Sequence, residues 1–467
     1  MNAPAGVAND TPIGLAPGVV LRCDLALSNP YSAFDVESGI RHELSPLAFL
    51  LLHVMEDASV RPSAIAAALA ARGVPTRGRA FHAGLARLLD AGLATTDRPV
   101  ARRPTRRGML EPLLTAVPVA STPVEMEVHF TSTCNLRCRH CFVSADGEPS
   151  AAEMPAADWR GVFDQLESAR VWQIVVSGGE PLVHPEARHI VEDLAQRQFA
   201  TALLTNGTLI DSALAYALSA PRFSVVVSLD GATERVHDAL RGDGAFARAM
   251  SGISRLGERG CRFSLSTTLH AGNTHEMEDL VRLARDCGAE SVGFIALDPI
   301  GRAAENADLH LAGEQRQDAL RRCQELALRY GDTIPIRYLD PRSCDPSPSS
   351  PGNSRLISCA AGTTWGAIRS DGALFPCVYA FAAPEFAVGS LLTDDLVDLW
   401  RTDRWSIFRG GLSLDSLIEC RDCPEAVACT IRNCRMRALF SGRGLLGPPP
   451  GCPQQAACAD REPGERR

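Results

Sequence analysis

The stretch that decides the fold is CNLRCRHC, which runs from Cys134 through Cys138 to Cys141 in a C-x3-C-x2-C spacing. Three thiolates on one short loop can hold three corners of a [4Fe–4S] cube and leave the fourth iron open to a ligand. The alternative is a structural zinc knuckle, which needs a fourth Cys or His such as His140. The loop follows a predicted strand, Glu125–Thr131. The residues beyond the loop therefore decide between the two interpretations.

Strands and helices alternate from this loop toward the C-terminus. Short runs of β-branched and apolar residues predict strands, and amphipathic helical patterns lie between them. The expected strands are Glu125–Thr131, Trp172–Ser177, Thr201–Thr205, Phe223–Leu229, Arg262–Thr268 and Ser291–Leu297. Six successive β/α units predict a parallel barrel, open or partial, with its site at the carboxyl ends of the strands. A further helix is expected near Gly313–Tyr330.

Glycine-rich and polar motifs follow the second, third and fourth predicted strands. They read SGGEP (177–181), TNG (205–207) and SLDG (228–231). Adjacent glycines let a backbone approach a ligand closely. Asn-Gly and Asp-Gly pairs are also common turn formers whatever the function. Their joint placement at one end of the barrel nevertheless favours a binding site there.

The cysteine spacing and these motifs together resemble the radical S-adenosylmethionine (SAM) superfamily. The resemblance implies that Cys134, Cys138 and Cys141 hold a [4Fe–4S] cluster whose open iron binds the amino and carboxylate groups of SAM. One-electron reduction then gives a 5′-deoxyadenosyl radical. It also implies SAM contacts, with His140 near the adenine and the paired glycines at the methionine amino group. The implied contacts are His140, Gly178, Gly179, Glu180, Pro181, Asn206, Ser228 and Asp230.

A second set of cysteines lies in the C-terminal part of the chain. An element from Cys359 through Gly372 to Cys377 precedes a C-x2-C-x5-C-x4-C run that ends at Cys434. The pattern resembles the SPASM extension of radical SAM enzymes, which binds auxiliary iron–sulfur clusters, although the family usually has three residues before the last cysteine of the run. A zinc ribbon is the local alternative for the run, and the upstream element favours SPASM.

The SPASM resemblance implies two auxiliary clusters, and so three [4Fe–4S] clusters in the chain. Cluster I is assigned to Cys344, Cys359, Cys377 and Cys434, and cluster II to Cys420, Cys423, Cys429 and Cys452. Cys458 is the alternative to Cys452, which is preferred because glycine and prolines around it suit a bent chain.

Residues 18–96 predict a small separate module with a winged-helix order. Two β-rich stretches precede three amphipathic segments and a short apolar run. These are Val19–Ser28, Tyr31–Val36, Ser45–Asp57, Arg61–Arg72, Gly78–Asp90 and Leu93–Ala94. The module resembles the peptide-recognition element typified by the pyrroloquinoline-quinone peptide chaperone, in which a leader peptide adds a strand to the sheet edge. DNA binding is the alternative, but it needs a basic recognition helix, and Gly78–Asp90 carries only Arg79 and Arg87 as bases.

Composition limits the function classes. The 467 residues are 45% hydrophobic with a net charge of −8, which argues against general affinity for nucleic acid or anionic membranes. The longest apolar run, near residues 47–55, is too short to span a bilayer, and the N-terminus lacks the basic region of a signal peptide. We therefore expect a cytoplasmic protein. Its sixteen cysteines would be reduced there, which favours metal ligation over disulfides.

The predicted fold class is α/β, with a partial (β/α)6 barrel between an N-terminal winged-helix-like α+β domain and a C-terminal cysteine-rich iron–sulfur domain. We predict leader recognition at 18–96, a linker at 97–123 and the barrel at 124–310. The auxiliary-cluster domain is placed at 340–458 and a tail at 459–467.

The predicted function is a peptide maturase that abstracts hydrogen from a ribosomally made precursor peptide and oxidatively installs a C–C or C–S cross-link. A cellular donor such as flavodoxin or ferredoxin would supply electrons. One alternative is a radical maturase of a protein or cofactor precursor, and a more distant one is an iron–sulfur DNA-binding regulator. Sulfatase-maturing enzymes carry an acid where Val378 stands, which disfavours their chemistry here. Tyr379 and Asp298 are the remaining loop candidates for a base, and a surface or structural role is favoured for each.

Overall fold

The computed structural model describes residues 12–24, 31–56, 60–70, 79–96, 119–145, 153–340, 356–417, 419–424, 426, 429, 433–449 and 452. Cys344 and Cys458, the first part of the predicted linker and the predicted tail lie outside the described residues. None of the helices in the described ranges is both long and apolar enough to cross a membrane.

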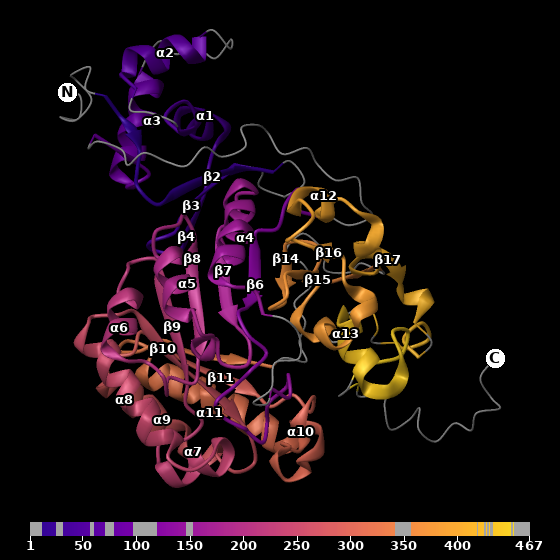
Figure 1. The fold of residues 1–467 in the computed structure, drawn as a ribbon. Coiled ribbons are helices and arrows are strands. Elements are labelled where there is room, and N and C mark those ends of the chain that lie inside the picture. The colour runs from indigo at the N-terminus through magenta and orange to yellow at the C-terminus, as the bar shows by residue number, and fades with distance from the viewer. Residues whose placement is uncertain are drawn as a thin grey trace.

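A ten-stranded sheet forms the centre of the molecule, in the order β12-β11-β10-β9-β8-β7-β6-β14-β15-β16 (Figure 1). The six strands predicted from sequence are present and parallel. They are β6 (Glu125–His129), β7 (Gln173–Ser177), β8 (Ala200–Thr205), β9 (Phe223–Ser228), β10 (Phe263–Leu269) and β11 (Val292–Ala296). The predicted partial barrel is therefore confirmed, and β12 (Ile336–Leu339) extends it by one further parallel strand.

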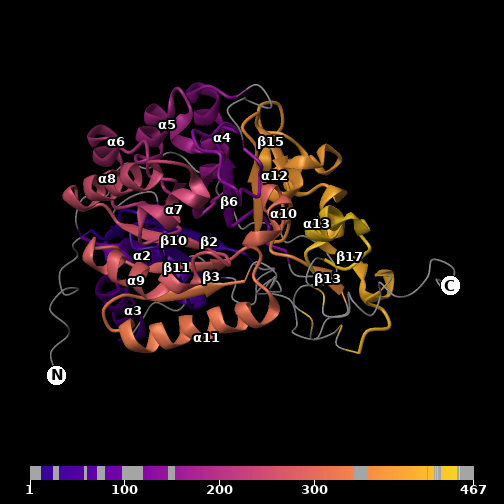
Figure 2. The same cartoon turned by 90° about the horizontal axis from the view of Figure 1, so that it is seen from below.

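Helices of the barrel region cover one face of its sheet (Figure 2). Those that contribute apolar residues to the core under the sheet are α4 (Ala156–Ser168), α5 (Ala187–Leu194), α6 (Ser212–Leu218), α8 (Ala245–Glu258), α9 (Met277–Asp286) and α11 (Gly313–Tyr330). The helices α7 (Glu234–Arg241) and α10 (Arg302–Glu305) share a smaller cluster with Leu297 and Leu309. Strand burial alternates accordingly: in β9 the side chains of Phe223, Val225 and Val227 are buried under helices. Ser224 and Ser228 face the opposite, concave side and are half-buried. Alternate side chains along each strand therefore point either into the helix-covered core or to the concave face.

The C-terminal region continues the barrel sheet. Strand β14 (Trp365–Ile368) pairs in parallel with β6, and β15 (Ala373–Phe375) and β16 (Gly389–Ser390) follow antiparallel. Strand β13 (Leu356–Ser358) pairs with β17 (Arg409–Ser413), and the short helices are α12 (Leu396–Trp400) and α13 (Arg435–Ala438). The segment 119–123 at the end of the predicted linker is buried here, since Trp400 Nε1 donates to the Ala120 carbonyl (2.7 Å). Packed structure therefore begins before residue 124.

The N-terminal module contains the antiparallel strands β2 (Val19–Cys23), β3 (Tyr31–Asp35) and β4 (Ile40–Glu43). Its helices are α1 (Pro46–Val54), α2 (Pro62–Ala70) and α3 (Arg79–Asp90), and β1 (Gly14–Leu15) pairs with β5 (Ala94–Thr95). Ile13 and Leu15 belong to its core, so the module extends before residue 18.

The module packs against the amino ends of the barrel strands (Figure 1). Phe34 of β3 stacks on Trp172, which directly precedes β7, with ring centroids 5.2 Å apart. Arg22 is fully buried at this junction, paired with Asp24 (2.8 Å) and donating to the Pro123 carbonyl. The module therefore lies at the end of the barrel opposite to the cysteine loop.

Candidate active site

The cysteine loop occupies the carboxyl end of β6. Cys134, Cys138 and Cys141 pack against Leu136 and Ala245, so the structure brings the three predicted thiols together. Burial raises the pKa of Cys134 to about 11 and also raises that of Cys138. Neutral thiols are favoured at such a site unless a cation or metal compensates the thiolate charge.

Two arginines that sequence analysis missed hold this loop. Arg241 Nη1 lies 3.9 Å from Cys138 Sγ and opposes the rise in the thiol pKa. Arg302 donates to the carbonyls of Cys138 (2.8 Å) and Ala145 (2.7 Å). No local sequence signal marked either residue, because each lies far from the loop along the chain.

The donor set fits a cluster better than a single metal ion. His140, the fourth ligand that a zinc knuckle would need, instead directs Nε2 toward Asp230 Oδ2 at 3.7 Å. A cube carries its thiolates on separate iron atoms and leaves one iron for another ligand.

Asp230 connects the loop to the strand ends. Its fully buried carboxylate accepts from Arg241 Nε (2.6 Å) and from the Thr268 amide (2.7 Å). Burial would raise the pKa of Asp230, but Arg241 and neighbouring histidines lower it overall, so the group is a carboxylate. Burial lowers the pKa of His140 to about 4, and its Nδ1 is buried without a partner in the described structure. The imidazole of His140 is therefore neutral, and its place beside adenine stays a prediction.

Glu180, which follows β7, accepts hydrogen bonds from residues at the end of β8. Its buried carboxylate accepts from Thr205 Oγ1 (2.7 Å) and the Asn206 amide (2.7 Å), which joins the second and third strand ends. Burial raises its pKa, and these hydrogen bonds oppose the rise. Asn206 in turn donates to Asn135 Oδ1 of the cysteine loop (2.9 Å). Both residues position the site, and Pro181 begins the short 3-10 helix Pro181–Val183 beside them.

Gly178 and Gly179 must be glycines because the backbone leading into the cysteine loop packs directly against them. A Cβ at Gly178, where φ is +139°, would lie 2.4 Å from the Thr131 carbonyl oxygen. A Cβ at Gly179 would lie 2.1 Å from the Thr133 carbonyl oxygen. The sequence predicted that the two glycines let the backbone approach a ligand closely. In the structure they let it approach the backbone of Thr131 and Thr133, and no side chain fits at either position.

The C-terminal cysteines gather in two places. Cys359 and Cys377 share one apolar cluster. Cys434 lies close enough to raise the pKa of Tyr379, which follows Cys377 by two positions. Burial raises the pKa of Cys420 to about 11, and three more thiols add to the rise, those of Cys452, Cys429 and Cys423. The assignment of each cysteine to one auxiliary cluster stays a prediction.

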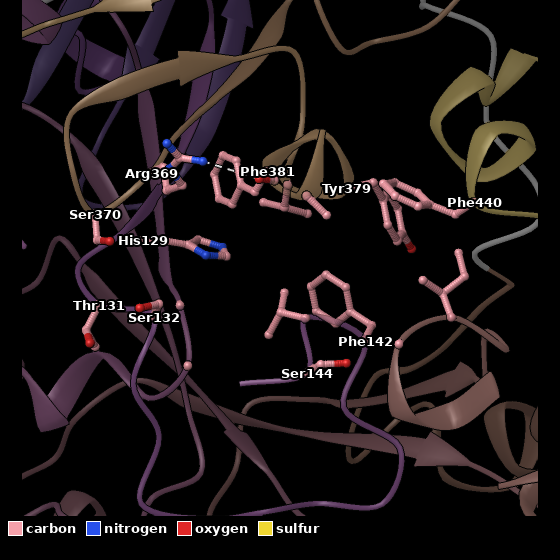
Figure 3. Close-up of a pocket in the computed structure, with 17 residues that line it drawn as sticks. His129, Thr131, Ser132, Phe142, Ser144, Arg369, Ser370, Tyr379, Phe381 and Phe440 are labelled. Atoms are coloured by element: carbon pink, nitrogen blue, oxygen red, sulfur yellow. Dashed lines mark hydrogen bonds between the residues drawn. The ribbon is translucent and has the colours of Figure 1, made fainter. Parts of the chain in front are cut away.

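A cavity of about 430 Å³ lies between the cysteine loop and the C-terminal region (Figure 3). Gly178 and Gly179 form part of its lining, as does Phe142, which directly follows Cys141. Tyr379 and Phe440 from the C-terminal region line it as well. Both halves of the predicted site thus contribute to one space.

Two residues for which sequence analysis favoured a surface or structural role meet beside this cavity. Tyr379 Oη donates to Asp298 Oδ2 (3.2 Å), and Arg437 donates to both oxygens of Asp298 (2.6 and 2.8 Å). Burial and the Asp298 charge raise the pKa of Tyr379 well above its usual value. Tyr379 lines the cavity and so belongs to the site, while Arg437 carried no sequence signal.

Comparison with known proteins agrees with this geometry. Residues 128–284 match the radical SAM superfamily, and residues 359–424 match the SPASM iron–sulfur cluster-binding domain. The chain belongs to the radical SAM superfamily, among its members with a SPASM domain. It is therefore an enzyme that uses SAM and an iron–sulfur cluster, with further iron–sulfur binding in the SPASM domain.

Particular relatives narrow the class. The chain is 30% identical over 341 residues to the mycofactocin maturase MftC of Mycobacterium ulcerans, covering 71% of this chain and 88% of the relative. It is 26% identical to the subtilosin biosynthesis protein AlbA of Bacillus subtilis over 60% of each chain. The structure of Streptococcus suis SuiB bound to precursor peptide SuiA shares the fold, with a TM-score of 0.71, 14% identity and coverage of 94% and 99%.

Proposed function

We propose that this enzyme matures a ribosomally made precursor peptide by installing a C–C or C–S cross-link. The observation that carries the proposal is the cavity formed jointly by the cysteine loop, the glycine pair and the SPASM region. A peptide segment held there would lie between the radical source and the auxiliary cluster ligands. The similarity to the maturase MftC and to AlbA supports a peptide substrate.

The cysteine sets would hold three [4Fe–4S] clusters. Cys134, Cys138 and Cys141 would bind the SAM cluster. The auxiliary ligands would be Cys344, Cys359, Cys377 and Cys434 for one cluster and Cys420, Cys423, Cys429 and Cys452 for the other. When bound, these groups supply a 5′-deoxyadenosyl radical and an acceptor for one electron. A donor such as flavodoxin or ferredoxin would reduce the SAM cluster, and such thiol-rich ligation favours the reducing cytoplasm.

Forming one cross-link removes two hydrogens from the peptide in total. One peptide carbon would lose a hydrogen atom and the partner group a proton, and the new C–C or C–S bond would join them. The SAM-derived radical would be the hydrogen acceptor, and an auxiliary cluster held by the C-terminal cysteines would be the acceptor of the remaining electron. The residues at the cavity would orient the peptide and exclude water while this occurs.

The N-terminal module would recruit the leader. Strand β4 is an outer strand of the β2-β3-β4 sheet, and Ile40, Arg41 and Glu43 on it are exposed. An open strand edge offers unpaired N–H and C=O groups to an added strand. We include neither nucleic acid nor membrane among the proposed partners, because the chain carries a net charge of −8.

The test is anaerobic reconstitution followed by assays of SAM cleavage and peptide mass. We expect about twelve irons per chain, 5′-deoxyadenosine, and a peptide lighter by two hydrogens when a precursor encoded beside the gene is added. Cys377→Ala should lower the iron content by about four and abolish the peptide product. Cys323→Ala is the matched control, because Cys323 is buried in α11 away from both cysteine sets.

The outcomes separate the alternatives. SAM cleavage without leader affinity in the module would favour a radical maturase of a protein or cofactor precursor. Specific DNA binding without SAM cleavage would favour the regulator. About four irons per chain would refute the auxiliary clusters.

A further inference from the structure

The mouth of the cavity is built from aromatic rings. Phe142 of the cysteine loop and Phe440 of the SPASM region line it and are 38% and 39% exposed. Phe142 packs against Tyr379 with centroids 5.6 Å apart, and Phe381 forms a further wall (Figure 3). Large apolar side chains left in contact with water at a cavity mouth indicate an apolar partner.

The charged groups in the cavity lining already have partners. Arg369 pairs with Asp371 (2.6 Å) and donates to the Phe381 carbonyl (3.3 Å). His129 Nε2 lies 3.1 Å from Glu127 Oε1. Among the described lining residues, Arg369 and His129 are the only Arg, His, Asp or Glu side chains. A charged substrate side chain would therefore be buried without a counter-ion, which is strongly unfavourable.

Tyr379 adds to the hydroxyls of Thr131, Ser132, Ser144 and Ser370 on this lining a phenol whose hydrogen has a fixed direction. Its hydroxyl hydrogen is directed to Asp298, which Arg437 holds by two hydrogen bonds from a fully buried position. The phenol oxygen of Tyr379, on the cavity lining, can then act only as an acceptor toward a further partner. A substrate group that meets it must carry a donor.

We propose that the cavity binds an uncharged, ring-bearing side chain of the precursor peptide, and that Tyr379 selects one with a hydrogen-bond donor, a phenol or an indole, over a plain phenyl ring. This inference rests on the proposed function and adds the class of side chain at the site. The cavity volume of about 430 Å³ exceeds one ring, and the part lined by the predicted SAM contacts Gly178 and Gly179 is left for the cofactor. Gly178 and Gly179 place this side chain beside the predicted SAM contacts.

The test compares binding of three core peptides to the full-length protein by fluorescence anisotropy. The peptides carry tyrosine, phenylalanine or glutamate at the modified position and are otherwise identical. We expect tyrosine to bind about 3- to 10-fold more tightly than phenylalanine, the size of one net hydrogen bond. Glutamate should bind more weakly still. Tyr379→Phe should bring the tyrosine-to-phenylalanine ratio to about one.

Phe440→Ala is the matched control at the mouth of the cavity. This substitution removes apolar contact with both the tyrosine and the phenylalanine peptide. It should weaken the binding of both equally and leave the ratio of their affinities unchanged. Equal binding of tyrosine and phenylalanine by the unaltered protein, or an unchanged ratio in Tyr379→Phe, would overturn the inference while leaving peptide maturation in place. Absence of any peptide binding or modification, with SAM cleavage intact, would refute the proposed function and the inference with it.

Discussion

Replacing Asp230 by asparagine tests whether this residue positions the site or contacts SAM directly. The carboxylate is completely buried and pairs with Arg241 at 2.6 Å. Asparagine keeps an oxygen for the Thr268 amide but removes the charge. Leaving a buried guanidinium without its partner costs about 3–5 kcal/mol. We therefore expect Asp230→Asn to lower the unfolding free energy of the cluster-free protein by that amount, measured by urea denaturation followed by circular dichroism.

The matched control is Glu192→Gln. Glu192 pairs with Arg188 at 2.9 Å on the exposed face of α5, and both side chains are largely in water. Its loss should change the unfolding free energy by less than about 0.5 kcal/mol. Unchanged stability in Asp230→Asn together with lost SAM affinity would refute the positioning role and make Asp230 a direct SAM contact.

Three further outcomes follow from the geometry. Gly179→Ala places a Cβ 2.1 Å from the Thr133 carbonyl oxygen, next to the cysteine loop, and should lower the iron content by about four atoms per chain. The control is Gly161→Ala in α4, whose Cβ meets no atom within 4 Å and should leave the iron content unchanged. Asp24→Asn leaves Arg22 buried without a carboxylate and should cost about 3–5 kcal/mol of unfolding free energy, again measured in urea. Burial and the charge of Glu127 raise the pKa of Glu125 from 4.5 to about 7. The neutral form of Glu125 is the one the folded state favours, so its contribution to stability is fully present below pH 4.5. That contribution is lost as the pH rises through 7. Glu125→Gln should thus match the unaltered protein at pH 4.5 and be about 3 kcal/mol more stable at pH 8, and a constant difference across this range would contradict the assigned pKa.

The periodicity of apolar residues was sufficient to predict most barrel strands and helices, but not to predict every strand that pairs with them. The six barrel strands and α11 are recognisable because burial alternates along each strand and recurs every turn of each helix. Strand β12 was missed because Ile336–Leu339 is short and half-exposed. Strand β14 was missed as a barrel strand because its partner β6 lies more than two hundred positions earlier in the chain.

The sequence by itself determined the strand-end motifs and the class of enzyme, because both depend on the spacing of neighbouring residues along a strand or loop, whereas the cysteine sets stay a prediction from the family resemblance. The tertiary structure alone decided what the polar residues do. Asp230 meets Arg241, and Tyr379 meets Asp298 and Arg437, only after distant strands and the SPASM region come together. Ion pairs and cavities are properties of three-dimensional proximity, which residue spacing along the chain does not encode.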